Sequence, residues 1–201
     1  MLFRSQAVRL FGAGRDSRFG LLCAGLFWGA GSVLRFLLVA WVPVALEISD
    51  TKTPANLSAA VAVGIAAGAA IAARLISLEN VNRVLVPGFM MGVLVVMLAP
   101  MQSLPESVLV LAALGIASGM FIVPINALLQ ECGHRTIGAG HAVAVMNFFN
   151  NLAMLVLVAL YTLAARAGAP AIPTAYGFGA LLLIGMSAIA LWRLRDSHDR
   201  T

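Results

Sequence analysis

The chain has 201 residues, of which 61% are hydrophobic and only 10% are charged. Soluble domains carry about a quarter charged residues, so this composition excludes an ordinary soluble domain and indicates a surface covered by lipid. The net charge of +5 comes from arginines near the ends of apolar runs rather than from one basic face, so we expect no nucleic-acid partner.

Six apolar runs follow one another along the chain, each long enough to cross about 30 Å of hydrocarbon as an α-helix. They are continuously apolar rather than alternating, which argues against barrel strands. The sequence therefore predicts an all-α membrane protein with transmembrane helices at about residues 19–46, 57–78, 84–101, 107–130, 138–165 and 171–194, preceded by an N-terminal segment (1–18) and followed by a tail (195–201).

The distribution of basic residues predicts the orientation of these spans. Loops on the side of the N-terminus are rich in arginine, and loops on the other side hold only Lys52 and Arg166. Because basic loops stay inside, we expect both termini in the cytoplasm. The inner arginines are Arg4, Arg9, Arg15, Arg18, Arg74, Arg83, Arg135, Arg193, Arg195 and Arg200.

Arg35 lies deep in the first predicted span. Eleven residues of helix separate it from Leu46, about 16 Å, which is further than a guanidinium comfortably reaches toward the interface. An arginine within the bilayer costs from about 3 to more than 10 kcal/mol, so Arg35 must face a cavity or a partner. It either anchors an anionic group such as phosphate or pairs within the bundle to hold helices together.

The fourth span ends with a proline and two amides, Pro124, Asn126 and Gln130. Pro124 removes one backbone hydrogen bond and is expected to bend the helix near its inner end. Asn126 and Gln130 are one turn apart and would serve either a gate or a head-group contact, or simply form the polar end of the helix.

The fifth span carries three amides, Asn147, Asn150 and Asn151, at i, i+3 and i+4. This spacing predicts one face, which must turn inward because amides facing lipid would lack partners. The face either lines a cavity or makes interhelical hydrogen bonds. His141, one turn inside this span, is better explained as a hydrogen-bonded interfacial residue than as a proton relay.

The usual catalytic and metal-binding motifs are absent from the sequence: H-E-x-x-H, G-x-S-x-G, a P-loop and C-x-x-C. The predicted spans also contain no acidic residue. An intramembrane hydrolase or a haem carrier would need such a constellation, so we expect neither an enzyme nor a cofactor.

Several segments resemble the lysophospholipid transporter family of the major facilitator superfamily. The most specific is the P-x-N-A-L-L-Q stretch at 124–130, which is followed by the G-A-G-x-A-x-A-V-x-N stretch beginning at Gly138. Further matches are the segments 26–31 and 177–181, and the resemblance runs from about Asp16 to Leu194.

This resemblance implies a fold of twelve spans in two six-helix halves, of which this chain would be the C-terminal half, with substrate bound between the halves. It implies movement of lysophospholipids such as lysophosphatidylethanolamine across the bacterial inner membrane to the cytoplasmic leaflet. There an acyltransferase–acyl-carrier-protein synthetase re-acylates them. Expected partners are therefore the lipid substrate, membrane lipids, the missing N-terminal half and, functionally, that synthetase.

The resemblance also places the candidate residues. The first, second, fourth and fifth helices of each half line the cavity in that fold, which assigns Arg35, Asn126 and the asparagine trio to lining helices. Arg74 and Arg83 flank the position of the superfamily's inner-gate basic motif, which is degenerate here. The family has a glutamine where Met146 stands and a carboxylate where Asn150 stands, which argues against a charge-coupled role for this face and leaves Arg35 without an acidic partner in this half.

The first five residues, Met1-Leu2-Phe3-Arg4-Ser5, match the translation of a common sequencing-adaptor end. We therefore expect residues 1–5 to be a sequencing artefact and the chain to be a truncated reading frame. The alternative is a natural half-transporter that forms homodimers. Two other functions remain open at this point: an exporter of drugs or metabolites from the same superfamily, and a membrane assembly subunit without transport activity.

Overall fold

A computed structural model describes residue 12 and residues 14–198 of the chain; residues 1–5 and the end of the tail lie outside this range. Six of its helices are long and apolar enough to cross a membrane. This confirms the prediction of an all-α protein with six transmembrane helices. The elements are α2 (Arg15–Ala45), α3 (Lys52–Leu75), the 3-10 helix η1 (Leu78–Val84), α4 (Leu85–Leu98), α5 (Leu104–Thr136), α6 (Ala139–Arg166) and α7 (Ala171–His198).

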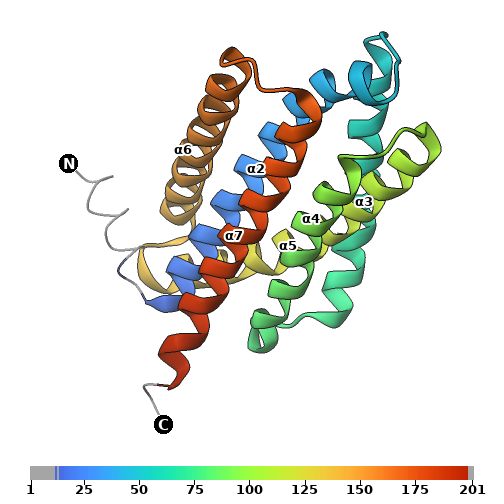
Figure 1. The fold of residues 1–201 in the computed structure, drawn as a ribbon. Helices are drawn as coiled ribbons and strands as arrows, with labels where there is room; N and C mark the ends of the chain where they lie inside the picture. Colours follow the sequence, from blue (N-terminus) through green and yellow to red (C-terminus); the bar gives the residue numbers. More distant parts are fainter. Residues whose placement is uncertain (1–11, 13, 199–201) are drawn as a thin grey trace.

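The six long helices run alternately up and down through the bundle (Figure 1). As a result, α2 begins and α7 ends at the same end of the molecule, the lower end in Figure 1. The connections are short, and the third span is formed by η1 and α4 together (Leu78–Leu98). Non-helical backbone angles at Asn80 mark a kink inside η1.

The tightest helix pair is α3 with α5, and glycines make it possible. Gly64 and Gly68 on α3 face Gly115 and Gly119 on α5, and a Cβ built at Gly64 would lie 2.8 Å from the Gly115 Cα. A Cβ at Gly68 would meet the carbonyl oxygen of Ile116. Lipid gives helices no hydrophobic reason to associate, so this close backbone approach holds the pair together by van der Waals packing.

Two other pairs use the same device. On α2, Gly29 receives Leu157 of α6, whose Cδ1 atom would lie 2.5 Å from a Cβ at this glycine. On α4, Gly92 packs against Leu183 of α7, and Gly179 of α7 packs against Val96. The pairs α2–α6, α3–α5 and α4–α7 therefore form the frame of the bundle.

The core lies around α2 and α5, and the open side of the molecule is formed by α3 and α6. In their apolar stretches 50% of the α2 residues and 56% of the α5 residues are buried, but only 22% in α3 and 17% in α6. The buried Trp41 indole donates a hydrogen bond of 3.2 Å to the Ala99 carbonyl, which ties α2 to the end of α4. Helices α3 and α6 thus present most of their surface outward.

Candidate functional site

Arg35 lies in a cavity of about 380 Å³ bounded by α2, α3 and α6. Helix α2 contributes the floor, including Ser32 and Trp28, which lie one and two turns before Arg35. Helix α3 contributes Ser58 and a row of small residues, and α6 contributes Met154. The wall is mainly apolar, with a guanidinium and two hydroxyls as its polar groups; the remaining lining residues are Phe27, Gly31, Leu34, Leu38, Ala59, Val61, Ala62 and Ile65.

The guanidinium of Arg35 is exposed and makes no hydrogen bond or ion pair with any residue in the described part of the chain. The two hydroxyls beside it are already engaged: Ser32 donates to the Trp28 carbonyl at 3.0 Å and Ser58 to the Pro54 carbonyl at 2.9 Å. Each hydroxyl oxygen still has a lone pair free to accept. Five N–H donors in an apolar cavity at membrane depth form a site suited to an anionic group with two or more oxygens.

The asparagine trio does not share one environment. Asn147 and Asn151 are exposed and lie on the same stripe of α6 as Met154, which lines the Arg35 cavity. Asn150 is only 7% exposed. It lies on the stripe of α6 that also carries Ala153 and Leu157, the residues that pack against Gly25 and Gly29 of α2. The structure therefore brings two of the three amides toward the cavity side and turns the third into the α2–α6 contact.

The side-chain oxygen of Asn150 is buried and has no hydrogen-bond partner among the described residues. A buried, unpaired amide oxygen costs about 1–3 kcal/mol. Asn150 therefore does not fit the role of a hydrogen bond that holds α2 and α6 together in this conformation.

Helix α5 continues through the buried Pro124 and ends at Thr136 as one uninterrupted α-helix. Asn126 is half-buried and Gln130 is exposed. Gly119 of α5 packs beside Ile65 and Gly68 of α3, and the two helices run in parallel. Two turns further along, Asn126 therefore lies at about the level of the end of α3, below the Arg35 cavity rather than in its wall.

The other candidate gate residues lie at the ends of helices. Arg74 is in the last turn of α3, Arg83 at the end of η1, and His141 in the first turn of α6. All three are exposed and none lines the Arg35 cavity. They share the end of the bundle at which α2 begins and α7 ends (Figure 1).

The same end holds a polar network centred on Arg193, which the sequence analysis did not single out. Its guanidinium pairs with Asp16 at 2.5 Å and donates to the Asn82 side chain at 3.1 Å. It also lies over the Phe19 ring, 4.7 Å from the centroid. The network ties the start of α2, η1 and the end of α7 together. Its members are far apart in the sequence, so no local pattern reveals it.

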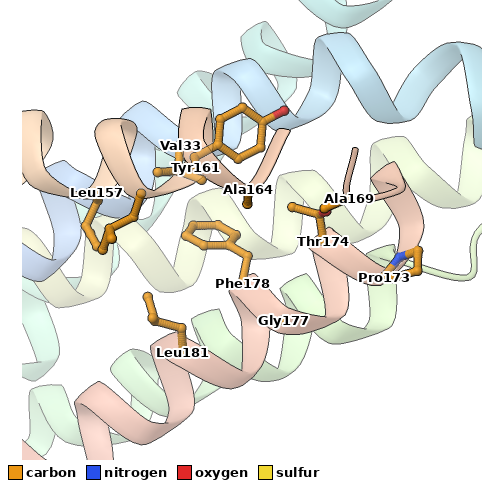
Figure 2. A pocket seen from close by; sticks show the side chains of 11 residues that line it. Val33, Leu157, Tyr161, Ala164, Ala169, Pro173, Thr174, Gly177, Phe178 and Leu181 are labelled. Atoms are coloured by element: carbon orange, nitrogen blue, oxygen red, sulfur yellow. The ribbon is translucent and has the colours of Figure 1, made fainter. Parts of the chain in front are cut away.

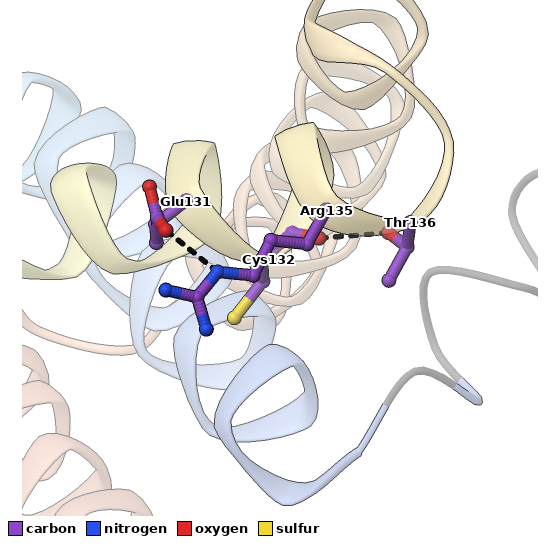
Figure 3. A network of polar contacts seen from close by, with 4 residues as sticks. All are labelled: Glu131, Cys132, Arg135 and Thr136. Atoms are coloured by element: carbon purple, nitrogen blue, oxygen red, sulfur yellow. Dashed lines mark hydrogen bonds and ion pairs between the residues drawn. The ribbon is translucent and has the colours of Figure 1, made fainter.

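A second polar contact at this end is local (Figure 3). Arg135 donates to the Glu131 carboxylate at 2.6 Å, and Thr136 donates to the Cys132 carbonyl at 2.8 Å. The Arg135–Glu131 pair is an exposed i, i+4 pair on α5, and such pairs contribute less than about 1 kcal/mol. Glu131 is therefore paired with Arg135 at the end of α5 and does not neutralise the charge of Arg35.

Comparison with known proteins identifies strong relatives. The chain is 47% identical over 90% of its length to a lysophospholipid transporter LplT of Salmonella arizonae. It is 49% identical over 89% of its length to one of Photorhabdus laumondii, and 46% identical over 90% to one of Escherichia coli. No family model and no solved structure matches the chain.

The chain covers 45–46% of each of these relatives, so it spans about half of their length. That share is consistent with a C-terminal half of such a protein. The similarity extends over nine tenths of the chain and so includes the segments on which the resemblance was based. The resemblance to lysophospholipid transporters of the LplT family is confirmed.

Proposed function

We propose that the chain is the C-terminal half of a secondary transporter that carries lysophospholipids, such as lysophosphatidylethanolamine, toward the cytoplasmic leaflet of the bacterial inner membrane. The observation that carries this proposal is the 46–49% identity, over nine tenths of the chain, to proteins named lysophospholipid transporters. It favours this function over export of drugs or metabolites and over a purely structural subunit.

The chemistry of the Arg35 cavity supports the same substrate class. A lysophospholipid combines a phosphate with an acyl chain, and the cavity combines a guanidinium without a partner in the described chain with a mainly apolar wall. The phosphate would accept a bidentate pair from Arg35, while the chain would lie along Trp28, Leu34 and Leu38. Asn147 and Asn151 stand on the same side of α6 and would contact the polar part of the substrate or the opposite half.

The exposed sides of α3 and α6 support a missing N-terminal six-helix half as the partner. These two helices are the least buried of the bundle, and the Arg35 cavity opens between them. An arginine and two amides facing lipid would be costly, so this face needs a protein cover or a water-filled path. A second six-helix unit placed against it would enclose the cavity from the other side.

The membrane orientation rests on the arginine count. Both ends of the described bundle lie on one side, together with Arg74, Arg83 and Arg135, whereas Lys52 and Arg166 lie at the other end. The positive-inside rule then assigns the termini to the cytoplasm. A product delivered there would be accessible to a cytoplasmic re-acylating enzyme, the acyltransferase–acyl-carrier-protein synthetase.

Substitution of Arg35 tests the proposed role of the cavity. In a twelve-span protein made by joining this chain to the first half of a relative, Arg35→Ala should lower the uptake of lysophosphatidylethanolamine into spheroplasts by about 10- to 100-fold. This is the loss of one charge-assisted contact of roughly 1.5–3 kcal/mol. Arg35→Lys should retain part of the uptake, because it keeps the charge but not the bidentate geometry.

The matched control is Arg135→Ala, which removes an exposed arginine far from the cavity and should leave uptake unchanged. Uptake that survives Arg35→Ala at the level of the control would refute the assignment of Arg35 as the phosphate anchor.

A further inference from the structure

Helices α6 and α7 follow each other in the chain but hardly touch. Helix α6 packs on α2, and α7 packs on α4 and α2. A gap therefore remains between α6 and α7, and α2 lies at the bottom of this gap. Two cavities lie along this gap, one of about 350 Å³ near the α6–α7 connection and one of about 410 Å³ nearer the start of α2. Leu157 lines both, and we call the two cavities together the α6–α7 furrow.

The part of the furrow near the α6–α7 connection is shown in Figure 2. Leu157, Tyr161 and Ala164 project from α6, and Phe178 and Leu181 project from α7 into the same space. Gly177 leaves the α7 wall open, because a Cβ built there would meet no atom within 4 Å. The residues lining the rest of the furrow are Leu21, Leu22, Gly25, Leu26, Phe149, Leu152, Ala153, Val156, Gly185 and Ile189.

Almost nothing in the furrow can bind a polar ligand. The Tyr161 hydroxyl donates to the Phe36 carbonyl at 3.3 Å and the Thr174 hydroxyl to the Pro170 carbonyl at 2.7 Å. The other lining groups are hydrocarbon or small. Both helices span the hydrocarbon layer, where an apolar furrow is not filled by water, and an empty one would lose dispersion contacts along two helices.

The furrow lies on the side of α6 away from the Arg35 cavity. Each residue turns a helix by about 100°, which places the furrow residues Phe149, Val156 and Leu160 roughly opposite Asn147 and Asn151. A second six-helix unit that covers the polar side of α6 therefore leaves the furrow facing the bilayer. The occupant is then a membrane lipid rather than the missing half or the cargo.

We propose that the α6–α7 furrow binds one acyl chain of a resident diacyl phospholipid, whose phosphate pairs with Arg166. Arg166 is in the last turn of α6, at the end of the furrow that Ala169 closes, and a side chain of this length can run along the helix surface to a phosphate at the head-group level. It is exposed and has no acidic partner among the described residues. The bound chain fills the space between two helices that lack direct contacts and so supports α6 in its position on α2.

Photo-crosslinking tests the furrow directly. The 201-residue chain is reconstituted in vesicles of phosphatidylethanolamine and phosphatidylglycerol that contain phosphatidylethanolamine with a diazirine in one acyl chain. The labelled peptides are then mapped by mass spectrometry. We expect labels to concentrate on 157–164 and 177–181, and Gly177→Leu to lower labelling there about tenfold, because the added side chain displaces about two methylene groups.

Two further variants make the result decisive. Ala164→Leu narrows the furrow from the α6 wall and should act like Gly177→Leu, so the test does not depend on one substitution. Val86→Phe adds bulk to an exposed position of α4, outside the furrow, and should leave labelling unchanged. Arg166→Gln should reduce labelling in the furrow without changing its position.

Labels spread evenly over all lipid-exposed residues, and unaffected by Gly177→Leu and Ala164→Leu, would overturn the proposal. Displacement of the probe by lysophosphatidylethanolamine but not by unlabelled diacyl phospholipid would also overturn it, because the furrow would then bind the cargo. Neither outcome bears on Arg35, whose role is read from uptake.

Discussion

At the scale of single residues, the Arg35 guanidinium and the Asn150 side-chain oxygen both lack a partner among the described residues, and they differ in burial. The Arg35 guanidinium is exposed in a cavity, and the Asn150 oxygen is enclosed in the α2–α6 contact. An exposed cation can be satisfied by a ligand or by an opposing protein unit, neither of which reaches an oxygen enclosed between α2 and α6. Of the two, Arg35 is therefore the group suited to bind substrate.

The Arg193 network gives a prediction about stability. Arg193→Ala removes the ion pair to Asp16, the hydrogen bond to Asn82 and the contact with Phe19 at once. We expect it to lower the free energy of unfolding by about 1–3 kcal/mol, measured by a denaturant titration of the detergent-solubilised chain. Asp16→Asn, which removes only the charge of the partner, should cost about 1 kcal/mol or less, because Asp16 is 56% exposed.

The control for this prediction is Arg135→Ala, which breaks the exposed pair with Glu131 and should change stability by no more than a few tenths of a kcal/mol. Equal effects of Arg193→Ala and Arg135→Ala would show that Arg193 does not join the three elements.

Some of the site residues could be predicted from their own stretch of sequence. Others could not, because their environment depends on how distant helices pack together. Arg35 could be found because an arginine deep in an apolar run is costly wherever the helix packs. The split of the asparagine trio could not be found, because the three positions span about 100° of the helix and only the placement of α2 decides which of them is buried. The Arg193 network joins residues 16, 82 and 193, which no spacing rule connects.

At the scale of helices, the bundle is assembled from pairs whose backbones approach closely at glycine. The α3–α5 pair is the extreme case, because a Cβ at Gly64, Gly68, Gly115 or Gly119 would collide with backbone atoms of the partner helix. Backbone cannot rotate away as a side chain can, so even alanine must push the helices apart.

This predicts a sharp difference between two chemically identical substitutions. Gly68→Ala should lower the free energy of unfolding by about 1–3 kcal/mol through overpacking. Gly31→Ala, at a position where a Cβ meets no atom within 4 Å, should be neutral or slightly stabilising, since alanine is the better helix former. Both are measured by the same denaturant titration. Similar stability of the two variants would contradict the assigned α3–α5 contact.

The helices themselves were predictable from the sequence, because a span needs only sufficient length and apolarity. The ends of the helices were less predictable. Helices α2, α3 and α5 extend beyond the apolar runs into polar sequence, and the segment before α4 forms the 3-10 helix η1. Glycine pairs in several spans indicated close packing, but which helices they join is decided by the whole bundle.

At the scale of the whole molecule, the six helices form a unit with one polar, open side and one lipid-facing side. Helices α4 and α7 pack together on one side, and the Arg35 cavity opens between α3 and α6. The chain covers a little under half of its relatives' length. We therefore interpret the open side as the place where the opposite half binds.

The proposal that this chain works as one half of a transporter is tested most directly by uptake of lysophosphatidylethanolamine into spheroplasts that lack their own lysophospholipid transporter. The chain is expressed alone, together with the first six-helix half of an Escherichia coli relative, or with that half and Arg35→Ala. We expect uptake only when both halves are present, and we expect Arg35→Ala to abolish it. Full uptake by the chain alone, or no uptake by two halves that form a stable complex, would contradict the proposal.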